Sequence, residues 1–334
     1  RRRHTRCSRD WSSDVCSSDL HLTAAGCLLV ITLAVAAVER PITAECLVCP
    51  KPLGQGVYMV QGLAALGTSA NRNFISNAGF VITPEGVIVI DALGSPALAQ
   101  ALVKEIQRIT PLPITHVLVT HFHADHIYGL QVFKALGARI LAHEAGKQYL
   151  HSDTAKARLV ASRRELSPWV DENTELVFSD EWITQDRTLN VGGMVFELMH
   201  LGPAHTAEDM VVYLPLQQVV FAGDVMFRQR IPFIGQADSH HWQQALTQLS
   251  ALNVAWVVPG HGAASQDFKQ DLLLTLNYLQ FVRSSMLRAV EEGLSFEEAY
   301  EAADWSQFKH LPLFGRSEEH TSELQSRLHL VCRL

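Results

Sequence analysis

The segment that most constrains this chain is an apolar run, residues 114–119, that passes directly into a cluster of metal-binding side chains: His121, His123, Asp125 and His126. The run predicts a buried strand, so the cluster follows the carboxyl end of that strand. Side chains two residues apart on a strand point the same way, so His121 and His123 can converge on one point, and Asp125 and His126 can turn toward a second. Imidazoles and carboxylates suit zinc and other borderline divalent metals. The segment therefore predicts a metal site.

Three later motifs repeat this arrangement, in which an apolar run ends in a histidine or an aspartate. Each motif places that residue beside a Gly or Pro that forces a turn. The motifs are Gly202-Pro203-Ala204-His205-Thr206, Phe221-Ala222-Gly223-Asp224 and Val257-Val258-Pro259-Gly260-His261-Gly262. The functional signal lies in their joint order along the chain, because a single loop histidine or a single aspartate after Gly is common.

This order of motifs resembles the metallo-β-lactamase-fold superfamily over roughly residues 56–265. The resemblance implies an α/β fold, namely a four-layer αβ/βα sandwich that holds its metals between the edges of two β-sheets. It also implies the ligands. His121, His123 and His205 form a three-nitrogen site, while Asp125, His126 and His261 form a second site and Asp224 bridges the two. Asp125 is also expected to have a catalytic role.

The expected cofactor is a pair of Zn²⁺ ions, with a single Fe²⁺ as the alternative. A zinc ion with three protein ligands keeps an open position for water and lowers the pKa of that water toward about 7. Two metals about 3.5–4 Å apart can share a hydroxide and then hold both the attacked oxygen and the leaving group. The expected activity is therefore hydrolysis of a carbonyl substrate by a metal-bound hydroxide, with a thioester or ester as the favoured substrate.

Residue 224 narrows the chemistry that the resemblance implies. The β-lactamase branches commonly have Cys or Ser at this point, whereas Asp224 resembles the thioesterase, glyoxalase-II-like and sulfur-dioxygenase branches. A β-lactam substrate therefore ranks lower. Two further alternatives stay open: a mononuclear-iron persulfide dioxygenase-like oxidoreductase, and a non-catalytic metal-binding accessory protein of a periplasmic redox relay. The motifs look closest to a periplasmic subgroup linked to sulfur-oxidation and quinoprotein-dehydrogenase systems.

Three residues near the ligand motifs are candidates for substrate binding. Arg228 and Arg230 follow Asp224 on one segment, and a guanidinium binds a carboxylate through two parallel hydrogen bonds. The alternative is that they are surface arginines paired with acidic residues. Tyr128 follows the first cluster and is placed either to donate a hydrogen bond to the oxyanion or to pack in the core.

The two ends of the chain differ in composition from the rest. Residues 10–20 and 316–326 resemble translations of short-read sequencing adapters in opposite orientations, so 1–20 and 316–334 are interpreted as artefacts. Residues 24–38 are apolar and uncharged and fall short of the ~20 residues that a membrane-spanning helix needs. We interpret 21–44 as a truncated signal peptide, which predicts export to the periplasm and no stable membrane insertion after its removal.

Residues 45–315 are then the metallo-β-lactamase-fold domain. They carry 18 Lys and Arg against 27 Asp and Glu, a net charge of −9, which makes nucleic acid a poor partner and favours a small-molecule substrate. Their only cysteines, Cys46 and Cys49, are spaced for a small disulfide or a redox pair, although the βαβ context of a redox motif is absent. The oligomeric state stays open.

The pattern of apolar residues and turn signals predicts two halves that each contain strands and helices. Strands are predicted at 56–61, 74–83, 87–91, 114–120, 139–142, 176–178, 194–200, 210–214, 219–222 and 256–258. Helices are predicted at 95–110, 128–136, 144–166, 240–252 and 267–292.

A chain trimmed to residues 45–315 should match the full chain in melting temperature and in activity, because the removed segments are interpreted as foreign or as a leader. Scanning calorimetry and turnover of the two purified proteins measure this. A marked fall in melting temperature after trimming would show that the end segments contribute to the fold.

Overall fold

The computed structural model describes residues 46–235 and 237–316. The predicted signal peptide and nearly all of the two adapter-like segments lie outside these residues. Among the residues that are described, no helix is both long enough and apolar enough to cross a membrane.

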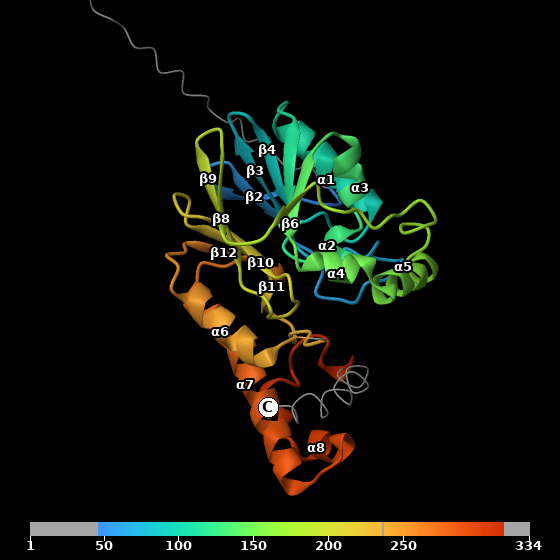
Figure 1. Cartoon of the computed structure of the whole chain (residues 1–334), viewed down its shortest axis with the longest axis vertical. Helices are drawn as coiled ribbons and strands as arrows, with labels where there is room; N and C mark the ends of the chain where they lie inside the picture. Colours follow the sequence, from blue (N-terminus) through green and yellow to red (C-terminus); the bar gives the residue numbers. More distant parts are fainter. Residues whose placement is uncertain (1–45, 236, 317–334) are drawn as a thin grey trace, which may run out of the picture. The chain divides into compact units, whose positions relative to one another are not determined.

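Two β-sheets form the centre of the fold (Figure 1). The first sheet has the strand order β1-β2-β3-β4-β5-β6-β7, with bounds Lys51–Gly54, Val57–Val60, Ala78–Thr83, Gly86–Ile90, Ile114–Leu118, Arg139–His143 and Glu181–Ile183. The second has the order β12-β11-β10-β9-β8, with bounds Trp256–His261, Val219–Phe227, Met210–Leu214, Met194–His200 and Arg187–Val191. Strands β4 to β7 are mutually parallel, as are β11 and β12.

Helices cover the outer face of each sheet (Figure 1). On the first sheet α1 and α3 supply the packing residues, and on the second sheet α6 and α7 supply them. The helices are α1 (Pro96–Ile109), α2 (Ala124–Ile127), α3 (Leu130–Ala135), α4 (Gly146–His151), α5 (Asp153–Glu165), α6 (Ser239–Ser250), α7 (Phe268–Glu292) and α8 (Phe296–Ala302), with short 3₁₀ turns at Trp305–Gln307 and Phe314–Arg316.

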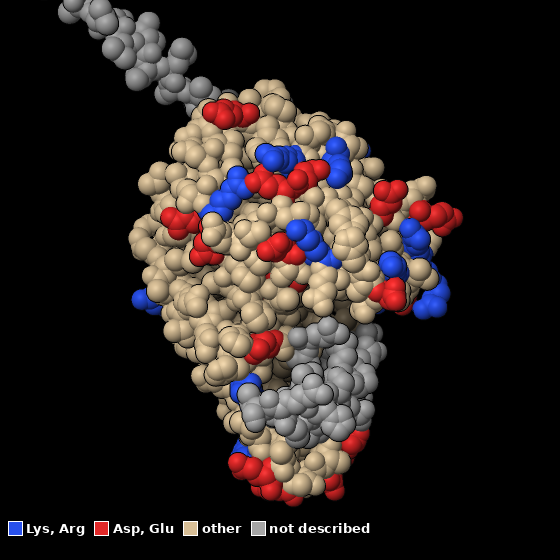
Figure 2. Space-filling model, viewed as in Figure 1, with Lys and Arg blue, Asp and Glu red and all other residues tan. Residues whose placement is uncertain are grey.

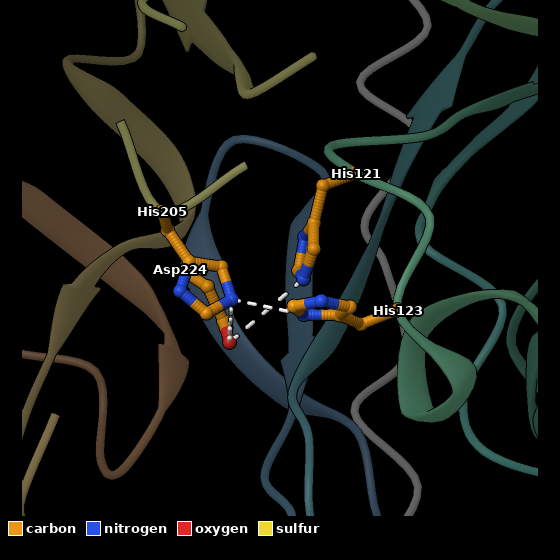
Figure 3. A group of neighbouring side chains, drawn as sticks. All are labelled: His121, His123, His205 and Asp224. Carbon is orange, nitrogen blue, oxygen red and sulfur yellow. Dashed lines mark hydrogen bonds and ion pairs between the residues drawn. The ribbon is translucent and has the colours of Figure 1, made fainter. Parts of the chain in front are cut away.

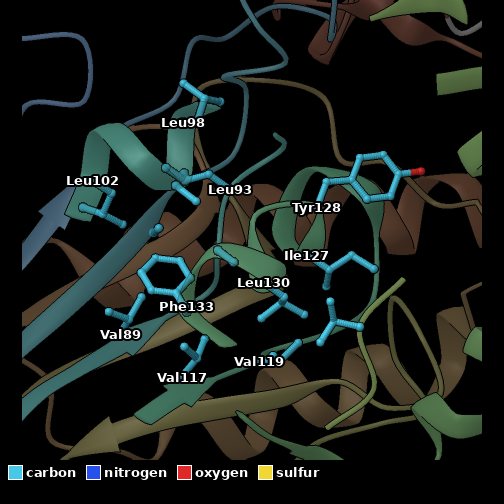
Figure 4. Close-up of a cluster of buried hydrophobic side chains, with 14 of the residues drawn as sticks. Val89, Leu93, Leu98, Leu102, Val117, Val119, Ile127, Tyr128, Leu130 and Phe133 are labelled. Carbon is cyan, nitrogen blue, oxygen red and sulfur yellow. The ribbon is translucent and has the colours of Figure 1, made fainter. Parts of the chain in front are cut away.

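Side chains alternate between the two faces of each strand, and this alternation explains why helices and sheets form four layers. In β4, Val87 and Val89 pack against the helices of the first sheet, as Figure 4 shows for Val89 beside Phe133, whereas Ile88 and Ile90 face the second sheet. Because both faces of each sheet are apolar, each sheet needs a cover on both sides. The result is the four-layer α/β arrangement that the motifs predicted, and that prediction is confirmed.

Asn77, just before β3, joins the first sheet to the end of β12 in the second. Its amide nitrogen donates to the carbonyl oxygens of Pro259 and Gly262, both at 2.7 Å, and its backbone N–H donates to Gly260 at 2.8 Å. The side-chain oxygen accepts from the backbone of Gly62 at 3.1 Å. This buried side chain therefore uses its donors and its acceptor to connect the loops of both sheets.

The predicted elements differ from the structure in several places, and three of these differences have a clear physical reason. Residues 176–178 are not a strand, because Val177 packs against the helix-side core while the backbone stays unpaired until β7 begins at Glu181. The predicted helix 144–166 is two helices, α4 and α5, because the side chain of Ser152 caps the start of α5. The short strands β1 and β8 were missed, since both are mostly exposed edge strands that lack an alternating apolar pattern.

A stacked pair of histidines links the two sheets. His143 ends β6 and His200 ends β9, and their rings lie 3.5 Å apart between centroids with an angle of 9°. His143 is only 7% exposed. Burial, helped by the neighbouring His200 ring, lowers the pKa of His143 to about 4.

Replacing His143 by Gln is expected to weaken the pH dependence of stability. The folded pKa lies below the ordinary 6.5, so as the pH falls the unfolded chain binds the proton first. This residue therefore lowers stability progressively from about pH 6.5 to about pH 4, with no further loss below that range. Urea unfolding at pH 7 and pH 5 tests this: acidification should lower the midpoint less in His143→Gln than in the wild type. Equal losses in both proteins would contradict the assignment.

Candidate metal centre

The seven predicted ligand residues gather where strand ends of the two sheets meet. The first sheet contributes the segment after β5, which carries His121 and His123 and leads into α2. The second sheet contributes Asp224 within β11, His261 at the end of β12 and His205 in the loop between β9 and β10. The structure places the seven in two groups, His121, His123, His205 and Asp224, and then Asp125, His126 and His261, whereas the resemblance implied Asp224 as a ligand shared by both. Within each group the ligand atoms all lie within 4.8 Å of one another.

In the first group the side chains converge on one point (Figure 3). Nδ1 of His123 lies 2.9 Å from Nε2 of His205, and Nε2 of His205 lies 3.3 Å from Oδ2 of Asp224. Nε2 of His121 lies 3.8 Å from the same oxygen. Strand alternation does not produce this convergence, because β5 ends at Leu118 and both histidines belong to the following loop.

The second group surrounds the other side of Asp224. Nε2 of His261 lies 3.3 Å from Oδ2 of Asp125 and 3.3 Å from Oδ2 of Asp224. Nε2 of His126 lies 3.7 Å from Oδ2 of Asp125 and 3.3 Å from Oδ1 of Asp224. The carboxylate of Asp224 therefore contacts histidines of both groups, which is the placement that a bridging ligand requires.

The close approach of Asp224 to this point depends on a glycine. A Cβ atom at Gly260 would overlap Oδ1 of Asp224. Position 260 therefore admits only a residue without a side chain, which gives the Gly in the Pro259-Gly260-His261 motif a physical reason.

Most ligand rings are oriented by a partner on the nitrogen that faces away from the site. Nδ1 of His126 lies 2.8 Å from Oδ2 of Asp91, and Nδ1 of His205 lies 2.9 Å from the carbonyl oxygen of Phe233. Nδ1 of His261 lies 2.8 Å from the carbonyl oxygen of Ile75. These partners orient the three rings so that Nε2 of each faces the cluster, where it can bind a cation in place of a proton.

Asp91 was not predicted as a site residue. It accepts hydrogen bonds from the backbone and the hydroxyl of Thr120, both at 2.8 Å, in addition to its contact with His126. A signal for it existed, because Asp91 directly follows β4, the parallel neighbour of β5, and the carboxyl ends of parallel strands share an edge.

Burial and charge set the protonation of the cluster. Burial lowers the pKa of His205 to about 3 and lowers that of His121 well below its usual range, so both rings are neutral. Burial would raise the pKa of Asp224, but His261, His126 and His121 hold it well below its usual range. Burial would also lower the pKa of His126, but the carboxylates of Asp125, Asp224 and Asp91 raise it well above 6.5. In the absence of a cation the site therefore combines anionic carboxylates with the neutral rings of His205 and His121 and with a His126 ring that the carboxylates keep protonated.

This donor set fits metal ions. Three buried polar atoms that face the cluster have no hydrogen-bond partner among the described residues: Nε2 of His121, Nε2 of His126 and Oδ1 of Asp224. An unsatisfied buried polar atom typically costs about 1–3 kcal/mol, so three at one point need a common partner. Cations bound between the two groups would satisfy all three atoms and neutralise the carboxylates.

A pocket of about 980 Å³ opens onto the centre. The ligands that line it are His123, Asp125, His205, Asp224 and His261. Its wall beyond the ligands includes Tyr149 on α4, Phe233, Glu208 and Arg230.

Of the two arginines predicted to bind substrate, only Arg230 lines the pocket. Arg230 is 8% exposed and lines the pocket, where Nη1 lies 3.1 Å from Nδ1 of His261. No carboxylate of the described residues pairs with it, and its Nε has no hydrogen-bond partner there. Arg228 points elsewhere and pairs with Asp271 of α7 at 2.8 Å.

Tyr128 also lies away from the pocket lining. It is 1% exposed in the helix-side core of the first sheet (Figure 4), and its hydroxyl donates to Ser162 at 3.2 Å. Of the two roles that its sequence position allowed, the structure places it as a packing residue. Tyr149 is the tyrosine of the pocket wall, and no sequence signal marked it, because it lies on a short helix outside every ligand motif.

On the face drawn in Figure 2, Lys and Arg side chains lie among Asp and Glu side chains rather than in one basic patch. This agrees with the acidic composition of residues 45–315.

Comparisons with known proteins give the family. The family model of the metallo-β-lactamase superfamily matches residues 71–261, more than half of the chain. The metallo-β-lactamase IND-1 of Chryseobacterium indologenes is 24% identical over 200 residues, which cover 58% of this chain and 75% of that protein. The linear primary-alkylsulfatase of a Pseudomonas strain is 22% identical over 253 residues, which cover 65% of this chain and 48% of that protein.

The fold also matches solved structures. The structure of the stereoselective inverting sec-alkylsulfatase Pisa1 from Pseudomonas sp. aligns with a TM-score of 0.62 at 18% identity, covering 76% of this chain and 45% of that one. This likeness shows the fold, while the family-model match extends across the histidine and aspartate motifs from His121 to His261. The chain therefore belongs to the metallo-β-lactamase superfamily of metal-dependent hydrolases.

Proposed function

We propose that this chain is a dinuclear-zinc hydrolase that cleaves a thioester or ester of a small molecule bearing a carboxylate. One observation carries the proposal: the Asp224 carboxylate contacts His205 of the first group and His126 of the second, each at 3.3 Å. A carboxylate shared by two ligand groups is the arrangement in which two cations sit close together.

His121, His123 and His205 would hold one ion, and Asp125, His126 and His261 the other, with Asp224 binding both. When bound, the ions supply Lewis acidity to the substrate carbonyl and lower the pKa of a water molecule. Zinc suits a set of five imidazoles and two carboxylates without a thiolate. Metal analysis of the purified protein separates this proposal from the single-iron alternative.

Asp125 is the ligand with the best position for a second task. Its carboxylate lines the pocket, and burial, which would raise its pKa, is outweighed by His126 and His261, which lower it. An anionic carboxylate at the pocket wall can accept the proton released when the nucleophile attacks. We therefore assign Asp125 a catalytic role in addition to metal binding.

The pocket recognises an anion through Arg230. Burial lowers the pKa of this guanidinium, while Asp224 and Asp125 raise it. A buried guanidinium that has no carboxylate partner among the described residues can form two parallel hydrogen bonds to a carboxylate of the substrate. This is the reason for including a carboxylate in the proposed substrate.

β-Lactam hydrolysis is the second candidate. The observation that favours it is that several relatives are named metallo-β-lactamases, among them IND-1. It ranks below thioester hydrolysis because residue 224 is Asp rather than Cys or Ser. The proposal also retains export to the periplasm, which is supported by the apolar segment within residues 21–44.

Arg230→Met should raise KM for a substrate with a carboxylate, such as a succinyl thioester, by roughly 10- to 100-fold, the usual worth of a charge-assisted hydrogen bond. KM for a neutral acetyl thioester should change little. Arg228→Met is the matched control, because Arg228 already pairs with Asp271 outside the pocket. Equal effects of the Arg230 change on both substrates would remove Arg230 from substrate recognition.

Asp224→Asn keeps the shape of the side chain but removes its charge. Binding of the metal held by Asp125, His126 and His261 should weaken by at least roughly 100-fold, since even outer-shell changes commonly cost 10- to 100-fold, while the three-histidine site keeps its metal. Hydrolysis should fall by orders of magnitude.

Zinc titration by calorimetry, alongside rates on thioesters, esters and β-lactams, measures both effects of the Asp224 change. Asp271→Asn serves as a control carboxylate outside both groups. Tight binding of two equivalents together with normal turnover in Asp224→Asn would exclude the dinuclear mechanism.

A further inference from the structure

The helix that carries Tyr149 packs against the loop that carries His121 and His123. Phe122 lies between His121 and His123, and helix α4 begins at Gly146 in direct contact with the Phe122 ring, so that a Cβ at Gly146 would overlap the ring. One turn later the helix carries Tyr149, because residues three apart share a helix face. The position of Tyr149 is therefore tied to the loop that carries two ligands.

The ring of Tyr149 stands against a ligand. Its centroid lies 6.4 Å from that of His123, with an angle of 83° between the rings. Its backbone carbonyl is fixed at the end of α4, where it accepts from the hydroxyl of Ser152 at 2.6 Å and from the backbone N–H of Ser152 at 2.9 Å. Helix packing on one side and these bonds on the other fix the backbone from which the phenol ring projects beside the centre.

Three other hydroxyl and amide donors of the pocket lining already have acceptors. The hydroxyl of Thr206 donates to Asp209 at 2.8 Å, that of Ser152 to Tyr149, and the side-chain amide of Asn73 to the carbonyl of Gly94 at 3.0 Å. Among the described residues, no side chain or backbone group forms a hydrogen bond with the hydroxyl of Tyr149. By contrast, the hydroxyls of Tyr128 and Tyr213 bond to Ser162 and to the carbonyl of Asn253.

A phenol that lines the pocket and has no acceptor among the described residues is a hydrogen-bond donor available to whatever fills the pocket. In carbonyl hydrolysis the carbonyl oxygen gains negative charge as the nucleophile attacks, and a fixed donor stabilises that charge more than the uncharged substrate. Arg230 cannot serve the same oxygen while it binds the substrate's carboxylate.

We propose that the Tyr149 hydroxyl donates a hydrogen bond to the carbonyl oxygen of the substrate as that oxygen becomes negative, which makes Tyr149 a catalytic residue beside His123. The phenol keeps its proton throughout and no covalent bond to it forms. The proposal rests on carbonyl hydrolysis as the proposed function.

The test compares the zinc-loaded full chain with Tyr149→Phe and with the matched control Tyr213→Phe, whose lost hydroxyl lies outside the pocket lining. Turnover of phenyl acetate gives kcat and KM. Calorimetry gives the dissociation constant of phenyl methylphosphonate, a stable mimic of the tetrahedral form of that ester. Bound zinc and melting temperature are measured for all three proteins.

Tyr149→Phe should lower kcat/KM by about 100-fold, mostly through kcat. It should weaken phosphonate binding by a similar factor, because a transition-state mimic senses the same interaction. Zinc content and melting temperature should stay unchanged, and Tyr213→Phe should match the wild type in turnover and in phosphonate binding.

Three results would overturn the role of Tyr149: unchanged kcat/KM in Tyr149→Phe, a lower rate with unchanged phosphonate affinity, or loss of zinc from that variant. If the wild type fails to hydrolyse esters, thioesters and β-lactams, the proposed function is wrong. In that case the phosphonate titration still decides whether Tyr149 contacts a bound oxyanion, and wild-type binding that Tyr149→Phe does not weaken, or no binding at all, counts against it.

Discussion

The carboxylate of Asp224 is the constraint on which the rest of the site depends. It projects from β11 of the second sheet and contacts four histidines, two of which, His121 and His126, follow strand β5 of the first sheet. A buried carboxylate at that point is strongly unfavourable unless positive charge faces it. The position of the two sheets, the absence of a side chain at Gly260 and the gathering of imidazoles all serve to supply that environment.

Three of the histidines around Asp224 are oriented by hydrogen-bond acceptors that lie outside the site. Asp91 at the end of β4 orients His126, and the backbone carbonyls of Ile75 and Phe233 orient His261 and His205. These acceptors orient the three rings so that their inner nitrogens face Asp224. The fold thus determines the orientation of the candidate ligands as well as their positions.

The sequence predicted the parts of the site that are local and missed those that depend on tertiary packing. His121, His123, Asp125 and His126 are recognisable because four ligand groups stand together after an apolar strand, and the layers follow from alternation in strands such as β4. The sequence did not show which of Arg228 and Arg230 lines the pocket. Asp271, which pairs with Arg228 and keeps it out of the pocket, lies 43 residues away along the chain. Tyr149 and Asn77 gave no signal, since their roles come from what α4 and β3 pack against.

Asn77 has a consequence for how the two layers are aligned. Apolar contact between two sheets is non-directional, so the core between them resists separation far more than it resists sliding. Hydrogen bonds are directional, and those from Asn77 to the carbonyls of Pro259, Gly260 and Gly262 fix the lateral position of β12 against β3 beside the site. If one sheet shifted by one residue relative to the other, the apolar core between them would stay largely buried. His261, however, would move away from Asp125. In this fold the core therefore holds the layers together, while directional contacts such as those of the buried Asn77 amide set their alignment.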